Sequence, residues 1–456
     1  MTRPSDPLAP LRSRSYLVLL VLAAILGVPV SAAAFGFLAL VSHLQGWIFT
    51  SLPKAVGYGS EPLWWPLPWL VLAGVLVALT IRYLPGTAGH EPADGFKAGG
   101  APAPIELPGV LVASLATLAS GVVLGPEAPL IAIGGGLALC AVRLAKPDAG
   151  QQARSAVAAA GSFAAVSALF GSPLPAAFLL MEASGVAGAT LELVLLPGLL
   201  AAGIGSLIFI GLGHWTGLGT FSLAIPHLAH VGTPDAAEFG WALVIGVVAA
   251  FVGHGIRGLG RLLQPVVSGR RLLLTPVAGL AIAGLAAAYG AGSARGTSEV
   301  LFSGQNALGP LITHGASYAV TTLLLLLACK ALAYSVSLSG FRGGPVFPSL
   351  LLGAAGGIAL SHLPGLPLIP AAAMAMAALF TVVLSLPLTA VLLVTLFLAS
   401  DGLAVMPLVI VAVVVAYVVA ARLAPPPAQQ ARRPAPAGDQ DVSAAAAPAA
   451  HPGPGG

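Results

Sequence analysis

The feature that most constrains this chain is a short motif that occurs twice. Residues 120–130 read SGVVLGPEAPL and residues 339–349 read SGFRGGPVFPS, at an offset of 219 residues (344 − 125). A second pair, Pro173-Leu174 and Pro387-Leu388, follows at an offset of 214 (387 − 173). Apolar segments interrupted by proline and glycine at matching places in two halves of a membrane chain indicate a transport site. The duplication therefore predicts two related halves that share one site.

The composition places those halves in a membrane. The 456 residues are 57% hydrophobic and only 7% charged, with a mean hydropathy of +0.97, whereas about a quarter of the residues of a soluble domain are charged. We find no nucleic-acid-binding motif and no Ser/His or Asp/Asp pair on adjacent apolar segments, so neither a nucleic-acid partner nor an enzyme is predicted. Cys140 and Cys329 are expected to be free thiols, and no metal site or other cofactor is expected.

We predict an all-α polytopic membrane protein, built as an inverted repeat with many tilted and broken helices. The first repeat (16–212) has apolar segments at 16–48, 63–84, 107–120, 127–144, 152–170, 173–183 and 188–212. After an inter-repeat loop at 213–239, the second repeat (240–423) has segments at 240–263, 272–290, 296–308, 316–336, 345–361, 370–384, 386–400 and 404–423. Several are too short to cross about 30 Å of hydrocarbon, so we expect broken helices around a covered site.

The two ends of the chain are expected to be cytoplasmic. Residues 1–15 contain Arg12 and Arg14, and the apolar run that follows resembles a signal peptide, but it is long enough for an uncleaved spanning helix. The tail, 424–456, is rich in Ala and Pro and is predicted to be disordered. Arg143 and Lys146 follow one copy of the motif helix, whereas no Lys or Arg follows the other copy. The positive-inside rule therefore predicts opposite orientations in a cell membrane.

Each copy of the motif has the features of an anion-binding helix start. Proline suits the first turn of a helix, and glycine lets the backbone approach an ion closely. The free N–H groups and the helix dipole of such a turn attract negative charge. The predicted anion-binding residues are Gly125, Pro126, Glu127 and Ala128 in the first copy, and Gly344, Pro345, Val346 and Phe347 in the second.

Glu127 is the candidate gate. An acid at membrane depth costs a few kcal/mol, so its presence favours a function over the simpler alternative of a carboxylate that only stabilises a helix start. We predict that it occupies the anion site when ionised and leaves it when protonated or displaced by the transported anion.

These motifs resemble signatures of the CLC family of chloride channels and transporters. Gly125-x-Glu127-x-Pro129 followed by Gly134-Gly135-Gly136 resembles the second signature, and Gly343-Gly344-Pro345-Val346-Phe347-Pro348 after Lys330 resembles the third. The resemblance covers residues 16 to 423. It implies a homodimer in the lipid bilayer with one anion pathway in each subunit, and it assigns Glu127 as the external gating glutamate.

Three departures from the family pattern bear on the mechanism. The first signature is replaced by Ala88-Gly89-His90-Glu91-Pro92, which puts Gly89 where the family has a serine. His90 and Glu91 are expected to face water at a helix entrance, and a role in gathering ions or protons is the alternative. Glu182 falls one position before the internal proton glutamate of exchangers. Ala183 falls on that position itself, so a structural role for Glu182 is favoured over a proton path. The filter tyrosine is assigned to Tyr417, with an interfacial or packing aromatic as the equal alternative.

Two cations also lie close to the second motif. Lys330 is expected to pair internally or to extend to the interface. Arg342 is expected either to draw anions into the outer vestibule or to pair with lipid phosphate. On these grounds the sequence predicts a glutamate-gated, passive pathway for chloride or a similar small anion. Proton-coupled chloride antiport and transport of another anion such as fluoride are the alternatives.

Overall fold

The computed structural model describes residues 10–96, 101–185, 189–217, 225 and 231–424. This part of the chain is helical and contains no β-strand, which confirms the predicted fold class. The first half consists of α1 (Arg14–Gly46), α2 (Leu52–Ala55), α3 (Pro66–Tyr83), α4 (Leu107–Ala119), α5 (Glu127–Ala145), α6 (Gln151–Phe170), α7 (Pro173–Ser184) and α8 (Ala189–Thr216). The second consists of α9 (Ala236–Gly269), α10 (Arg271–Ser293), α11 (Gln305–Thr313), α12 (Val320–Gly340), α13 (Val346–Leu360), α14 (Leu368–Leu384), α15 (Pro387–Phe397) and α16 (Gly402–Leu423).

Nine helices of the described chain are long and apolar enough to span a membrane. The first of them runs from Arg14 to Ala55, because α1 continues through a π-helical turn (Trp47–Ser51) into α2. α13, α14 and α15 are apolar but shorter, as the broken pattern of the sequence predicted. The predicted disordered tail lies almost entirely outside the described residues, as does much of the inter-repeat loop.

One predicted helix is wrong. The sequence pattern favours a helix over 296–308, but the structure has a single 3₁₀ turn at Thr297–Glu299 and begins α11 only at Gln305. The buried ammonium of Lys330 on α12 donates hydrogen bonds to the carbonyl oxygens of residues 299 to 302, at 2.9–3.3 Å. Phe302 and Gly304 adopt positive φ angles (60° and 88°). The segment is apolar because it is buried around Lys330 and not because it is helical.

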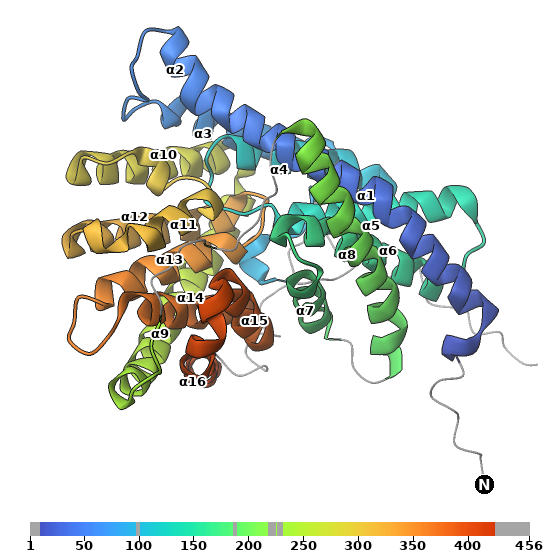
Figure 1. Cartoon of the computed structure of the whole chain (residues 1–456). Coiled ribbons are helices and arrows are strands. Elements are labelled where there is room, and N and C mark those ends of the chain that lie inside the picture. The colour runs from blue at the N-terminus through green and yellow to red at the C-terminus, as the bar shows by residue number, and fades with distance from the viewer. Residues whose placement is uncertain (1–9, 97–100, 186–188, 218–224, 226–230, 425–456) are drawn as a thin grey trace, which may run out of the picture.

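The two halves pack against each other along a central seam. In Figure 1 the helices of the second half, α9 to α16, gather on one side, and α5 to α8 with most of α1 lie on the other. α3 is an exception, because it packs against α10 of the second half. α14 is buried along its whole length from Ile369 to Leu384 and packs against α9, α13, α15 and α16.

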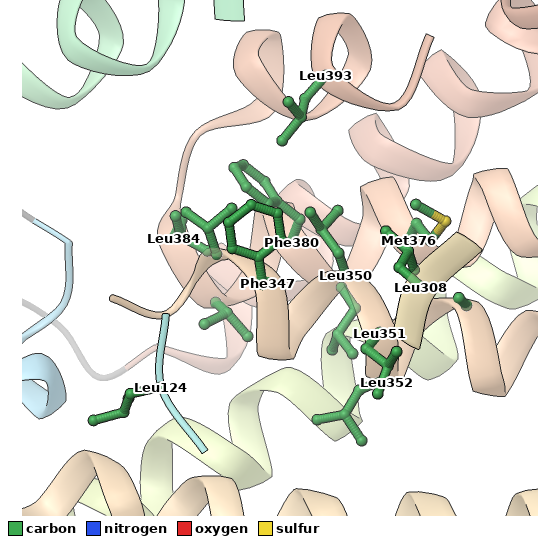
Figure 2. Close-up of a cluster of buried hydrophobic side chains, with 14 of the residues drawn as sticks. Leu124, Leu308, Phe347, Leu350, Leu351, Leu352, Met376, Phe380, Leu384 and Leu393 are labelled. Atoms are coloured by element: carbon green, nitrogen blue, oxygen red, sulfur yellow. The ribbon is translucent and has the colours of Figure 1, made fainter. Parts of the chain in front are cut away.

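The start of α13 is embedded in this core. Figure 2 shows Phe347 among the side chains of Leu350, Phe380 and Leu384, with Leu124 on the separate segment that leads to α5. The Phe347 ring also lies 6.1 Å from that of Phe170, which ends α6 of the first half. Side chains from both halves therefore hold the second motif in place.

Candidate functional site

The helices α5 and α13 begin in the same way. Pro126 and Pro345 are their N-cap residues, and Pro129 and Pro348 follow three positions later. The first turn of a helix has no internal partner for its N–H groups, and proline has no N–H to offer. Each first turn therefore presents two backbone donors, those of Glu127 and Ala128 in α5 and of Val346 and Phe347 in α13.

The two motifs are bonded to each other. The N–H of Gly125 donates to the carbonyl oxygen of Gly344, and the N–H of Gly344 donates to that of Gly125, both at 2.6 Å. This pair is antiparallel and is the one isolated β-bridge in the described chain.

A second pair of hydrogen bonds also joins the two halves, one in each direction. The N–H of Val123 donates to Ser337 Oγ on α12 (3.2 Å), and the N–H of Arg342 donates to Thr117 Oγ1 on α4 (3.4 Å). Val123 and Arg342 are 219 residues apart (342 − 123), which is the offset of the motif. The paired bonds relate the two halves by an approximate two-fold axis that passes between Gly125 and Gly344.

Both bridge positions leave no room for a side chain. A Cβ atom built on either Gly125 or Gly344 would collide with the carboxylate of Glu127. At these two positions glycine allows the close approach of the backbone to that carboxylate, and a side chain there would displace it.

Glu127 extends from the first motif to the second. Its side chain is completely buried, and its Oε1 accepts a hydrogen bond from the N–H of Phe347 at 3.2 Å. Its Oε2 has no hydrogen-bond partner among the described residues. The carboxylate thus lies at the free N–H groups of α13, where the helix dipole favours negative charge.

The tyrosine beside this site is not the one that the sequence analysis chose. Tyr417 lies on α16 with 44% of its surface exposed, and it does not belong to the buried core. Tyr334 on α12 is fully buried, its hydroxyl donates to the carbonyl oxygen of Pro345 at 2.9 Å, and it interacts electrostatically with Glu127. The exposure of Tyr417 agrees with the alternative of an interfacial or packing aromatic, and its filter role stays a prediction.

Tyr334 could have been found from its spacing. Lys330, Tyr334 and Ser337 recur at intervals of four and three in an apolar segment, so they share one helix face. The structure shows all three buried, with polar contacts to the segments around the two motifs. Polar residues on one face of a buried helix were the available signal.

Gly89 lies at a cavity next to the two helix starts. Its φ angle of +95° belongs to the left-handed region that favours glycine. The cavity has a volume of about 250 Å³ and is lined by Thr87–His90, by Ala128 and Pro129 after the gate position, and by Arg342, Gly343 and Pro345. We call it the Arg342 cavity.

The structure corrects the predictions for Arg342 and Glu91. Arg342 does not face lipid: it is only 4% exposed and donates to Glu91 Oε1 at 3.1 Å. Glu91 also pairs with Arg271 at 2.6 Å, so it belongs to an ion-pair network instead of facing water. Burial alone would raise the pKa of Glu91, but the nearby Arg342, a hydrogen bond from Gln264 and the nearby Arg271 lower it below its ordinary value. His90 is exposed, as predicted.

A larger cavity contains the residues that precede Glu127. It has a volume of about 730 Å³ and includes Lys54, Glu61, Leu124, Pro126 and Glu299 in its lining; we call it the Lys54 cavity. Its residues 59–61 lead into α3, whereas residues 87–90 of the Arg342 cavity follow α3. α3 has 18 residues and is about 27 Å long at 1.5 Å per residue. The two cavities therefore lie toward opposite ends of a candidate membrane span, with the Glu127 motif between them in the chain.

Glu182 closes a second contact between the halves. Its carboxylate accepts hydrogen bonds from the N–H of Leu388 (3.0 Å), the N–H of Thr389 (2.8 Å) and Thr389 Oγ1 (2.7 Å). It thereby caps α15, whose Pro387-Leu388 start repeats the Pro173-Leu174 start of its own helix α7. The expected bonding to backbone at a helix end is present, although its partner lies 206 residues away. No cluster of metal-ligating side chains occurs in the described residues.

Comparison with known proteins yields one consistent family. The family model described as "Voltage gated chloride channel" matches residues 73–421. The "Putative ion-transport protein YfeO" of Salmonella typhimurium is 32% identical over 361 residues, covering 78% of this chain and 84% of that protein. The protein of the same name from Escherichia coli is 30% identical over 362 residues, with 78% and 82% covered.

Two solved structures are similar in fold. One is the X-ray crystal structure of a slow cyanobacterial Cl⁻/H⁺ antiporter, with a TM-score of 0.71 and 21% identity over 89% of this chain and 94% of that chain. The other is the crystal structure of a CLC-type fluoride/proton antiporter, with a TM-score of 0.66 and 23% identity over 89% and 95%.

Proposed function

Because this chain belongs to the voltage-gated chloride channel (CLC) family of membrane transport proteins, we propose that it carries chloride or a similar small anion along a pathway gated by Glu127. The observation that supports the gate is the hydrogen bond from the N–H of Phe347 to the Glu127 carboxylate. A carboxylate in that position competes with an anion for the same backbone donors.

The pathway runs between the two cavities. An anion enters from the Lys54 cavity, replaces the Glu127 carboxylate at the free N–H groups of α5 and α13, and leaves through the Arg342 cavity, or moves in reverse. Helix dipoles and backbone N–H groups bind an ion weakly enough to release it, which conduction requires. Protonation of Glu127 or its displacement by the anion opens the path.

Transport is passive in this proposal. Ala183 occupies the position of the internal proton glutamate of exchangers and cannot carry a proton. The neighbouring Glu182 accepts three hydrogen bonds at the start of α15, so its carboxylate is engaged in holding the two halves together. Both solved relatives are named as proton antiporters, so proton-coupled exchange of chloride or fluoride is the alternative.

The proposed setting follows from the family and from the charge pattern. The protein acts in the cell membrane as a homodimer with one pathway in each subunit. Both termini are cytoplasmic, so that the Arg342 cavity opens to the cytoplasm and the Lys54 cavity to the outside. Arg143 and Lys146 at the end of α5 support this orientation.

The test is a flux measurement on purified protein in chloride-loaded liposomes, with chloride efflux and external pH recorded together. Chloride efflux with no pH change supports passive conduction. Efflux accompanied by alkalinisation of the external solution overturns the passive mechanism and establishes antiport. A chloride efflux no faster than that of protein-free liposomes overturns the proposal for chloride. The same assay with fluoride, bromide and nitrate then identifies the anion.

A further inference from the structure

The Arg342 cavity contains a feature that the helix-dipole site does not explain, namely a buried arginine. The side chain of Arg342 is 96% buried, yet the residue lines a cavity of about 250 Å³ beside both motifs. Removing a charge from water costs several kcal/mol unless it is paired and hydrogen-bonded. The ion pair with Glu91 accounts for the burial of Arg342, so its place at the lining of a cavity is the observation that indicates a role in binding.

The hydrogen bonds of Arg342 hold its side chain without using all of its donors. Nε donates to the carbonyl oxygen of Thr87 (3.0 Å), Nη1 to that of Phe341 (3.3 Å) and Nη2 to Glu91 Oε1 (3.1 Å). A guanidinium has five N–H donors, so two of them have no partner among the described residues. Thr87 lines the same cavity.

The charge of Arg342 is only partly neutralised. Glu91, its carboxylate partner, is shared with Arg271 at 2.6 Å and with Gln264. Neither Glu91 nor the nearby Asp94 lines the cavity, whereas Arg342 does. The acidic residue in the cavity lining is Glu106, which is half-buried and accepts the N–H of Ala103. Of the Arg342–Glu91 ion pair, only the positively charged partner, Arg342, therefore lines the cavity.

We propose that Arg342 is an anion-binding and selectivity-determining residue, which contacts the transported anion through its two unused N–H groups. This role rests on the proposed function and adds to it a fully charged ligand. The guanidinium supplies a side-chain contact on the side of the site where Gly89 has no hydroxyl. Glu91 limits the affinity. Because its negative charge partly neutralises Arg342, the anion is bound more weakly and can leave again.

The test compares two substitutions that break the same ion pair. Chloride binding to the purified full-length protein is measured by isothermal titration calorimetry for the wild type, Arg342→Gln and Glu91→Gln. We expect Arg342→Gln to weaken chloride binding at least about tenfold. We expect Glu91→Gln to strengthen it several-fold, because the guanidinium is then released to the anion. Arg82→Gln removes an exposed arginine that does not line the cavity and is expected to bind like the wild type.

Opposite directions distinguish a ligand from a structural support. If Arg342 only held the fold, both substitutions would weaken binding together, and that result overturns the proposal. Arg342→Lys keeps the charge, and binding within a few-fold of the wild type supports the role should the glutamine variant not fold. A wild type that moves chloride, together with an Arg342→Gln variant that binds it equally well, overturns the Arg342 role alone. A wild type that neither binds nor moves chloride overturns the proposed function as well.

Discussion

The carboxylate of Glu127 accepts a hydrogen bond from the N–H of Phe347, so a side chain of the first half lies at the helix start of the second. The residues are 220 positions apart and come together because Gly125 and Gly344 pair their backbones next to them. The site therefore exists only where the two halves meet, and disturbing either half should change the other.

The first prediction concerns the charge of Glu127. Glu127→Gln cannot ionise, so it should remove the dependence of anion flux on the protonation of this side chain. We expect flux at neutral pH to rise or persist and its pH profile to become flat in a liposome assay between about pH 4.5 and 7.5. Glu238→Gln, in the first turn of α9 and outside the lining of both cavities, is the matched control and should keep the wild-type profile. Identical profiles for wild type and Glu127→Gln would refute the gate.

A second prediction moves Glu127 without changing it. A Cβ at position 344 would collide with the Glu127 carboxylate, so Gly344→Ala should push that side chain out of its place at Phe347. Anion flux should then resemble that of Glu127→Gln in its weak pH dependence. Gly356→Ala on α13 is the control, since its Cβ would meet only the Leu327 side chain at 3.9 Å. A wild-type pH profile in Gly344→Ala, with protein of normal stability, would contradict the geometry.

The third prediction separates stability from coupling at Glu182. Glu182→Ala removes three hydrogen bonds at the start of α15, and the loss of a charged cap should cost about 1–2 kcal/mol. We expect a lower melting temperature in detergent and no change in proton movement during chloride flux. Unchanged melting combined with altered proton movement would instead assign Glu182 to a proton path.

Lys330 is the subject of the fourth prediction. Lys330→Met keeps an unbranched side chain, one atom shorter, but leaves the carbonyl groups of residues 299 to 302 without their shared donor. Burying unsatisfied carbonyls should destabilise the protein by about 3 kcal/mol or more. Thermal unfolding measures the effect, with the exposed Lys146→Met as control. Equal melting temperatures for the two variants would exclude a stabilising role for this cluster.

The fifth prediction is a pH dependence of stability. The pKa of Glu91 is lowered from its ordinary value of 4.5, because Arg342, Gln264 and Arg271 together outweigh its burial. A carboxylate whose pKa is lower when folded stabilises the protein fully above its unfolded value, and the contribution is lost as the pH falls through the folded value. The stability difference between wild type and Glu91→Gln should therefore be constant above about pH 5.5 and shrink below 4.5. A stability difference between the two proteins that grows on acidification would show that the pKa of Glu91 is not lowered in the folded state.

The two motifs were readable because their chemistry is local. Proline at 126 and 345 suits a helix start, and a single acid in an apolar segment attracts attention wherever the fold puts it. Their equal spacing predicted that the halves are related, and the reciprocal bonds between Gly125 and Gly344 bear out that relation. Most helix bounds also followed from apolar length alone.

The contacts between distant segments could not be predicted from the sequence, because they depend on how the helices pack. The break in the helix predicted over 296–308 depends on Lys330, whose buried ammonium donates hydrogen bonds to the carbonyl groups of residues 299 to 302. The partner of Arg342 depends on where the loop after α3 returns, and no local pattern relates Glu91 to a residue 251 positions away. Sequence by itself determined most of the helical segments and which segments are apolar and duplicated, because periodicity and proline act within a few residues. Only the tertiary structure decided which polar groups are buried together, because that depends on how the two halves cross.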